Sequence, residues 1–448
     1  MFSVHDPDAA DGLEELRMFR EDFYFCLTAR ADALFELVDA VLCAHGPVAS
    51  LAGLSLVPEH RRGHGAVYDA LNCGRVEIAR LRTTLAGLPL PRAADGRLVL
   101  AVDVSSWLRP DEVTCPRRCF CHTYGRRVGE HQMVPGWPYS LIVALETGCS
   151  SWTAPLDAQR LEPGADVLEV TCTQIRDLTE RLIDAGKWCD GDPDILIVLD
   201  AGYDGPRMAH LLADLPVQIL VRLRSDRVFR RPAPPYLFRP DGGRPARHGG
   251  EFVFKEPATW GAADIETRTD TRLYGQATAL AWKDLHPRLQ RRSAWAAWVG
   301  PMPILEGTVI RLTVEHLPSG GTNKPVWLWW SGTDATPRRY RSVLANVPAA
   351  LRYRAYLPDV EADPGLDPPT LTRPRGGRPL DLADAHRLYT VTVGPPPGRR
   401  SAPALGETPC ITTAHTRPSA ARVSTHPHED RHSRRCTETF QTWARTPA

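Results

Sequence analysis

The chain has no long apolar segment. Nowhere in its 448 residues do about 18 apolar residues follow one another, so no membrane-spanning helix is expected. The opening stretch MFSVHDPDAADGLEELRMFRED is acidic and polar, which argues against a secretory signal and favours the cytoplasm. A disordered or fibrous class is excluded for the whole, because 43% of the residues are hydrophobic and 24% are charged. The length predicts two to three domains.

Lysine is scarce as well, with only Lys187, Lys255, Lys283 and Lys324 against 50 arginines. The charge is uneven: residues 338–448 contain 17 arginines and 10 acidic residues, whereas residues 1–337 contain 37 basic and 43 acidic residues. Neutralisation of phosphates supplies most non-specific affinity for nucleic acids. The acidic balance of the larger part therefore argues against tight non-specific binding to DNA.

The eleven cysteines are scattered, and their odd number favours a reducing compartment over a disulfide framework. One cluster, C-x3-C-x-C-H, contains Cys115, Cys119, Cys121 and His122. This spacing fits no common zinc site, and no second pair of ligands follows it. We interpret these residues as buried or loop thiols rather than as a metal centre.

Helical periodicity dominates the first 92 residues. Apolar residues recur at helical spacing over 14–45 and again over about 64–87, and Gly/Pro pairs follow both stretches. The pattern predicts an all-helical N-terminal unit over residues 1–92. Two roles remain open for it, a cap on the next domain and a unit that binds DNA ends.

Residues 93–224 alternate between strand and helix patterns. Apolar runs predict strands at 97–103, 139–146, 194–200 and 217–224, with helices at about 166–186 and 206–215. This alternation predicts the α/β fold class. Short β-like runs between Pro- and Gly-rich turns then predict a β-rich insertion over 225–325, with a return to the core at 326–337. Residues 338–448 hold 15 prolines without periodicity, which predicts a disordered tail.

Two acidic residues end apolar strands. Asp103 closes RLVLAVD, and Asp200 closes the strand of DILIVLDAGYDG. Ligands and catalysis concentrate at this edge of α/β sheets. Two carboxylates there can hold divalent metal ions, which activate a nucleophile and stabilise a leaving oxygen in phosphoryl transfer. The alternative is that each aspartate caps the turn or helix that follows.

Five segments of the chain occur in a recognisable order. They are AVDVSSWLRPD (101–111), HTYGRR (122–127), PGWPYS (135–140), VLDAGYDGPRMAHLL (198–212) and VRLRSDR (221–227). Together they resemble bacterial insertion-sequence transposases of the DDE superfamily, in the branch whose RNase H-like core carries a β-rich insertion. The resemblance covers about residues 10–337.

The resemblance implies an Asp–Asp–Glu triad that binds two Mg²⁺ or Mn²⁺ ions and cuts and joins DNA. By motif, the first acid is Asp103 and the second is Asp200, which makes both metal ligands. Arg222 and Arg224 are candidate phosphate contacts, with a solvated strand end as the alternative. Tyr203 is expected to pack rather than to contact DNA. The implied partners are transposon-end and target DNA, a homodimer is compatible with the family, and no membrane is involved.

The third acid is missing. The family places a glutamate on a helix after the insertion, in the pattern Y-x2-R-x3-E-x6-K, and nothing after Trp330 matches it. Asp359 and Glu361 follow Pro358 in a non-helical context. Glu315 lies inside the insertion, before the expected place. It is a weak candidate.

A reading frame slipped by one base explains the missing acid. In the +1 frame, codons consistent with Arg341–Val393 can encode G-R-C-W-Q-T-F-L-R-R-Y-D-I-E-H-T-F-R-M-L-K-Q-T-L-G-W-T and, after a few residues, D-P-A-A-A-D-R-W-T-W-L-M-L-T-A-Y-T-Q-L-R-L. This text contains R-x3-E-x6-K, with the glutamate codon straddling Arg354 and Ala355. We therefore interpret the chain as a transposase frameshifted near 336–338 and impaired as written. A pseudogene, a sequencing error, a programmed frameshift and a natural disordered tail all remain open.

Two rival functions are compatible with the same residues. The chain could be a non-catalytic protein that binds transposon ends and competes with intact transposase. It could also be another RNase H-like nuclease, one that acts on RNA–DNA hybrids. Assays of end binding, strand cleavage and substrate preference separate the three.

Overall fold

The computed structural model describes residues 7–333 with short gaps. These gaps are residues 46–47, 49, 111–116, 125–130, 147–152, 237–244, 272–273, 292–294, 297 and 318–322. The predicted tail, residues 338–448, lies outside the described residues. The chain divides into two compact units, and the boundary between their described parts lies at Leu81–Arg82. None of the described helices is long and apolar enough to cross a membrane.

The first unit contains helices and one small sheet. Its helices are α1 (Pro7–Phe25), α2 (Ala31–Cys43), α3 (Leu51–Leu54), α4 (His64–Cys73) and the first turn of α5 (Ile78–Gly87). Strands β1 (Leu27–Ala29) and β2 (Arg75–Val76) pair antiparallel. The prediction of an all-helical unit is therefore wrong in this detail.

Both predicted helices of this unit are interrupted by that strand pair. The helix predicted over 14–45 breaks where Leu27 pairs with Val76, and Arg30 adopts left-handed backbone geometry with φ 54°. The helix predicted over 64–87 ends at Gly74. A Cβ atom there would lie 2.2 Å from the Ala70 carbonyl oxygen, which favours glycine. Pairing across nearly fifty residues overrides local helix propensity, because it satisfies backbone groups that the helix would otherwise satisfy.

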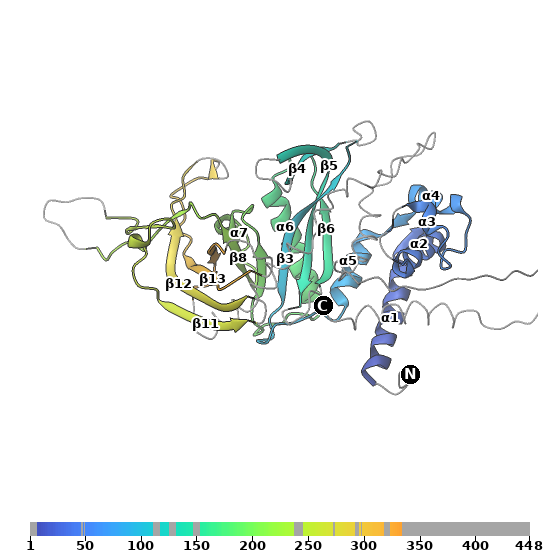
Figure 1. The fold of residues 1–448 in the computed structure, drawn as a ribbon, viewed down its shortest axis with the longest axis horizontal. Coiled ribbons are helices and arrows are strands. Elements are labelled where there is room, and N and C mark those ends of the chain that lie inside the picture. The colour runs from blue at the N-terminus through green and yellow to red at the C-terminus, as the bar shows by residue number, and fades with distance from the viewer. Residues whose placement is uncertain are drawn as a thin grey trace, which may run out of the picture. The chain divides into compact units, whose positions relative to one another are not determined.

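The described strands of the second unit form one twelve-stranded sheet, with α6 and α7 packed against it (Figure 1). The strands of the core are β3 (Val99–Leu108), β4 (Cys119–Tyr124), β5 (His131–Leu145), β6 (Thr153–Arg160), β7 (Ile195–Leu199), β8 (Val217–Leu223) and β14 (Val326–Trp330). The helices are α6 (Val167–Asp184) and α7 (Gly205–Leu211). The predicted α/β class is confirmed, and each predicted core strand and helix is present within a few residues, although β3 and β5 are longer than predicted.

The sheet order is β10-β9-β12-β13-β14-β8-β7-β3-β5-β4, with β6 also paired to β5 and β11 to β12. Strands β3, β7 and β8 run parallel, whereas every other described pair is antiparallel. Helix α6 connects β6 to β7, and α7 connects β7 to β8. Parallel strands need such helical crossovers, which carry their apolar faces onto the sheet.

The two faces of this sheet are built differently. On one face, α6 and α7 contribute Ile175, Leu178, Leu182 and Met208 to a core shared with Val102 and Leu199. The core on the other face contains residues from β3, β5, β7, β8, β11, β12, β13 and β14, together with Ala93. No described helix contributes to this second core. Within the described part of the chain, helices therefore cover only one face.

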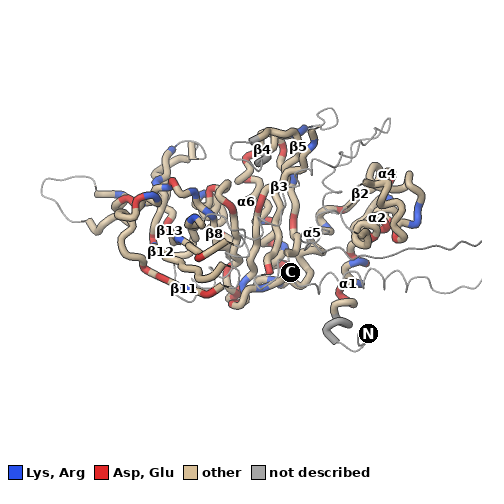
Figure 2. Tube along the Cα trace, in the orientation of Figure 1, with Lys and Arg blue, Asp and Glu red and all other residues tan. Residues whose placement is uncertain are grey.

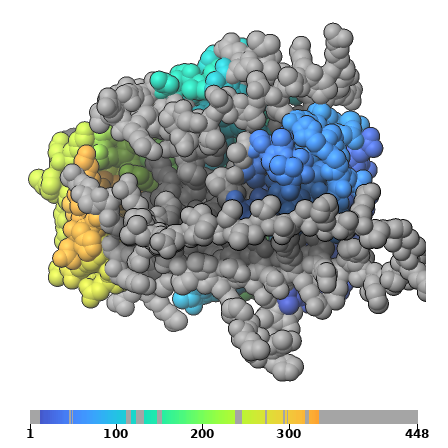
Figure 3. Space-filling model, turned by 45° about the vertical axis from the view of Figure 1, so that its right-hand side comes forward, coloured from blue at the N-terminus to red at the C-terminus, as the bar shows by residue number. Residues whose placement is uncertain are grey.

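The predicted β-rich segment extends the same sheet. It contains β9 (Val228–Arg230), β10 (Glu251–Val253), a 3-10 helix η2 (Pro257–Thr259), β11 (Ile265–Thr271), β12 (Gly275–Pro287) and β13 (Gly307–Val314). Phe252 and Trp282 pack around Trp327 of β14, with ring centroids 5.1 to 6.2 Å apart. Figure 3 shows this segment and β14 as one continuous mass, yellow-green to orange. Aromatic packing thus joins the insertion to the core.

Candidate active site

Asp103 lies where the parallel neighbour of its strand ends. Strands β3 and β7 pair in register up to Val102 and Leu199. The sequence predicted that this strand ends at Asp103, but β3 continues to Leu108. It continues because β5 still pairs with it antiparallel, Leu108 opposite Gly136. Asp103 is therefore a mid-strand residue at an open position of the sheet rather than a residue at a strand tip.

Asp200 directly follows β7 at the same level. Since Val102 pairs with Leu199, Asp103 and Asp200 are the next residues on adjacent strands, and adjacent strands lie about 4.8 Å apart. Strand β8 continues the row, because Leu199 pairs with Val221 and Arg222 comes next. The structure thus brings Asp103, Asp200 and Arg222 to one level across three neighbouring strands. Arg224 lies beyond the end of β8 and is exposed.

Backbone amides hold both carboxylates. The Val104 amide donates to Oδ1 of Asp103 at 2.8 Å, and the Gly202 amide donates to Oδ1 of Asp200 at 2.7 Å. A Cβ atom at position 202 would lie 2.9 Å from that Oδ1, so the close approach favours glycine. The next acid of the motif, Asp204, accepts the Arg207 amide and caps α7. The D-A-G-Y-D segment therefore positions one carboxylate and starts one helix.

The pKa of the Tyr203 phenol depends on both aspartates. Burial raises the pKa of its phenol, and the negative charges of Asp103 and Asp200 raise it further. Its buried hydroxyl faces Thr171 and Ser140 without a well-aligned hydrogen bond to a described residue. The ring packs against the core beneath α6 and α7. Packing is thus the observed environment of Tyr203, and its phenol lies close enough to both carboxylates for their charges to add to the effect of burial on its pKa.

A buried polar cluster supports the turn after β7. The Ser140 hydroxyl on β5 lies 3.4 Å from the Thr171 hydroxyl on α6. The Gln174 side-chain amide donates to the Ser140 carbonyl oxygen at 3.2 Å. All three residues are buried. This cluster fixes α6 against β5 beside Tyr203, and nothing in the sequence pattern pointed to it, because its members lie on separate elements.

Comparison with known families identifies the chain. Residues 22–288 match the model of the DDE superfamily endonucleases. This chain belongs to that family. No curated protein matches it. The match includes Asp103 and Asp200, and it confirms the resemblance drawn from the sequence motifs.

In this DDE endonuclease, Glu315 lies away from the two aspartates. It follows β13, and three strand spacings, about 14 Å, separate β13 from β7. Its Oε2 accepts the Gln276 amide at 3.0 Å, beside the turn between β11 and β12. Glu315 therefore belongs to the hairpin of the insertion, and the structure does not bring it to the site.

Cys119 and Cys121 are the thiols of the cysteine cluster that the structure describes. Burial raises the pKa of the Cys121 and Cys119 thiols, so both stay protonated near neutral pH. Cys115 lies outside the described residues. Among the residues that the structure describes, no group of three His, Cys, Asp or Glu side chains could hold a metal ion. Within this part of the chain, Asp103 and Asp200 therefore have no third such side chain grouped with them.

Charge is mixed along the part of the chain that the structure describes. Figure 2 shows acidic and basic residues interspersed over the described trace, without a long stretch of either sign. Steering of a polyanion by these residues is therefore weak. Contact between the described part of the chain and DNA depends on individual side chains near the site.

Proposed function

We propose that this DDE endonuclease descends from an insertion-sequence transposase that cleaves and joins DNA by two-metal phosphoryl transfer, and that it is impaired as written. The observation that carries the proposal is the register of Asp103 and Asp200 on β3 and β7. In a member of this family, two carboxylates at one level of adjacent parallel strands match the first two acids of the triad.

The topology around the two acids supports an RNase H-like core. The strands from β6 to β8 have the order β6-β5-β3-β7-β8. The first three of these strands pair antiparallel and the last three pair parallel. The first acid then lies on the central strand and the second follows its parallel neighbour, so both reach the same level of the sheet.

The donor set fits a hard divalent cation. Carboxylate oxygens are the ligands that Mg²⁺ and Mn²⁺ prefer, and the backbone amides at Val104 and Gly202 already orient both groups. Asp103 and Asp200 would hold the ion. When bound, it would supply a Lewis acid for the attacking and leaving oxygens. Arg222, at the same level on β8, would hold a phosphate of the DNA.

The direction of β14 determines where the chain leaves the core, before the expected position of the third acid. Strand β14 runs antiparallel to β8, and the Ser331 amide after it donates to the Ile219 carbonyl oxygen near the start of β8. The chain therefore leaves the described core at the edge opposite Asp200. A residue that completes the triad has to return along the length of β8, about 20 Å for seven residues.

The second face of the sheet supplies a route for that return. No described helix contributes to its core, and Ala101, two residues before Asp103 on β3, belongs to it. Side chains alternate along a strand, so Asp103 lies on this face. In the shifted frame, about 14 residues of the re-read text precede the glutamate at the Arg354–Ala355 codons, and the family places this glutamate on a helix. A helix of 14 residues spans about 21 Å, the length that the crossing requires.

The decisive experiment compares two purified proteins. One is the chain as written, and the other has a one-base correction near codon 337. The substrate is supercoiled plasmid that carries the DNA on both sides of the gene, since terminal repeats lie there. We expect Mg²⁺-dependent nicking by the corrected protein and at most a trace by the chain as written.

Two controls decide between the alternatives. The Asp200→Asn variant of the corrected protein should lose the nicking, which excludes a contaminating nuclease. Equal nicking by both proteins would contradict the loss of the third acid. Binding of the flanking DNA by the chain as written, without nicking, would instead favour the non-catalytic end-binding protein, and preferential cleavage of RNA–DNA hybrids would favour the other nuclease.

A further inference from the structure

The sheet continues beyond the acid pair on three strands. From Asp103, β3 runs five residues further to Leu108, and β5 and β4 accompany it in antiparallel pairs. The parallel strands have ended at this level, because β7 stops at Leu199. This three-stranded extension, at the top of Figure 1, therefore projects directly from the proposed catalytic edge.

Aromatic and arginine side chains gather on one face of the extension. Trp107 of β3 pairs with Trp137 of β5, and their rings meet edge to face with centroids 6.2 Å apart. The Arg109 guanidinium carbon lies 5.9 Å from both ring centroids. The Arg160 guanidinium carbon lies 5.2 Å from the Trp137 centroid. These cation–π contacts orient two positive charges on this face.

The same face carries exposed apolar groups. Phe120 of β4 pairs with Pro135, which shares the face of Trp137 on β5. Its side chain is 58% exposed, and Met133, on the same face of β5, is 49% exposed. Exposed large apolar residues beside oriented arginines mark a contact surface more than a solvated strand edge. The aromatic–arginine surface is defined here as Trp107, Arg109, Phe120, Met133 and Arg160, together with Trp137, whose side chain is buried beside them.

The face is continuous with the first acid. Asp103, Ser105 and Trp107 alternate along β3, so their side chains leave the sheet on the same side. Trp107 lies four residues beyond Asp103, about 13 Å along the strand. That span corresponds to about four steps of a nucleic-acid strand at 3.4 Å each. A strand held at Asp103 thus reaches the aromatic–arginine surface within a few nucleotides.

We propose that the aromatic–arginine surface binds unpaired nucleotides of the DNA strand that enters the acid pair. This inference rests on the proposed DNA substrate. The Phe120 ring offers an exposed face on which an unpaired base stacks, and Arg109 holds a flanking phosphate, while Arg160, 15% exposed, packs on the Trp137 ring. Duplex DNA cannot make this stacking contact with Phe120, because its paired bases are already stacked on one another.

The charges around the surface favour a nucleic acid over a second protein chain. Glu162 approaches Arg117 and Arg160 at 3.8 and 4.0 Å, at the outer limit of an ion pair. The side chain of Arg117 is 73% exposed. The Arg160 side chain is only 15% exposed, whereas the exposed ion pair of Arg117 with Glu162 contributes little free energy. A phosphate can therefore compete with Glu162 for Arg117.

The test measures binding by the full-length chain rather than cleavage. The probes are a fluorescein-labelled single-stranded oligonucleotide and its duplex, followed by anisotropy over a range of salt concentrations. Phe120→Ala should weaken binding of the single strand about tenfold, since stacking of one base contributes about 1–3 kcal/mol. Arg109→Gln should weaken it and lower the salt slope by about 0.7, the loss of one phosphate contact. Duplex binding should change less in both variants.

Matched controls lie in the insertion. Tyr236 is 60% exposed, and the Arg268 side chain is 66% exposed, so Tyr236→Ala and Arg268→Gln remove similar groups elsewhere. Both should bind the single strand as the unchanged chain does. If Phe120→Ala and Arg109→Gln also bind it unchanged, this inference is wrong while DNA remains the substrate. If the unchanged chain binds neither probe, the DNA substrate itself is wrong for this chain. A change in sedimentation without a change in DNA binding would assign the surface to a second copy of the chain and overturn the inference.

Discussion

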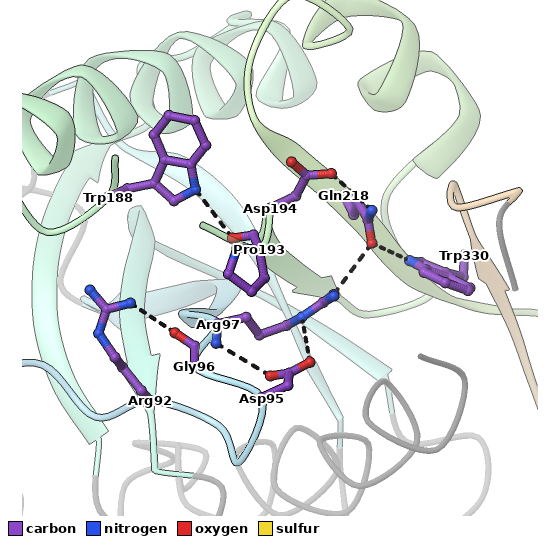
Figure 4. Close-up of polar contacts among 9 residues, drawn as sticks. All are labelled: Arg92, Asp95, Gly96, Arg97, Trp188, Pro193, Asp194, Gln218 and Trp330. Atoms are coloured by element: carbon purple, nitrogen blue, oxygen red, sulfur yellow. Dashed lines mark hydrogen bonds and ion pairs between the residues drawn. The ribbon is translucent and has the colours of Figure 1, made fainter. Parts of the chain in front are cut away.

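The two edges of the parallel strands differ in how their polar groups are held. At the edge where β3, β7 and β8 begin, Gln218 joins three elements (Figure 4). Its Nε2 donates to Asp194 at 2.9 Å, and its Oε1 accepts from Trp330 at 3.0 Å and from Arg97 at 3.3 Å. At the opposite edge, Asp103 and Asp200 stand side by side, and the Val104 and Gly202 backbone amides donate to their carboxylates.

The two edges are expected to contribute differently to the stability of the fold and to the reaction. Arg97 is 4% exposed, and its partners Asp95 and Gln218 satisfy its guanidinium, so that edge links β3, β8 and β14. Two carboxylates of like charge on adjacent strands repel each other unless a cation lies between them. The first edge is therefore expected to stabilise the fold, whereas the second is expected to cost stability and to serve the reaction.

The largest effect is expected at the acid edge. In the frame-corrected protein, Asp103→Asn should reduce Mg²⁺-dependent nicking about a thousandfold, because it removes one charged metal ligand. In the chain as written, the same change should raise the free energy of unfolding by about 1 kcal/mol, since it relieves the repulsion with Asp200. Urea unfolding checks the second value. A destabilised Asp103→Asn variant would show that the carboxylate is a structural group and would break the contrast between the edges.

At the edge that contains Arg97, a substitution is expected to lower stability and to leave nicking unchanged. Arg97→Met should lower the free energy of unfolding by about 3 kcal/mol, because it removes the buried guanidinium and its hydrogen bonds to Asp95 and Gln218. Nicking per folded molecule of the corrected protein should stay unchanged. Arg268→Gln, on the exposed face of β11, serves as the control and should stay within about 0.5 kcal/mol. A loss of nicking by folded Arg97→Met would mean that the two edges are coupled.

The smallest effect concerns the phenol beside the acids. The pKa of Tyr203 is raised in the folded chain by burial and by Asp103 and Asp200, whereas an unfolded tyrosine ionises near pH 10. The stability that Tyr203 contributes is therefore fully present below about pH 10 and is lost as the pH rises further, at about 1.4 kcal/mol per pH unit. Tyr203→Phe should unfold less steeply with alkaline pH, in urea titrations between about pH 9 and pH 11. Identical slopes in both proteins would remove Tyr203 from the neighbourhood of the charged pair.

Local patterns predicted the core elements well. The apolar runs that predicted strands at 194–200 and 217–224 correspond to β7 and β8, and the periodicity over 166–186 corresponds to α6. These elements are buried on one or both faces, so the burial that they need is visible in the sequence itself. The order of motifs also identified the family, which the match over residues 22–288 confirms.

Local sequence patterns failed to predict the bounds of elements that depend on a pairing partner distant in the sequence. The break between α1 and α2 contains no glycine or proline, and it exists because Leu27–Ala29 pairs with Arg75–Val76. The length of β3 beyond Asp103 likewise depends on β5, which follows after more than twenty residues. Pairing partners of this kind satisfy backbone hydrogen bonds that no local propensity describes.

The candidate site shows the same division between sequence and structure. The sequence by itself determined that Asp103 and Asp200 follow apolar strands, and that no glutamate of the expected pattern follows Trp330. Only the tertiary structure decided that the two aspartates share one level and that Arg222 joins them. It also decided that Glu315 lies several strands away and that Tyr203 lies near both charges. The reason is physical: a strand specifies its own burial through its side chains, whereas its neighbour and its register are set by the competition of all strands for pairing in one sheet.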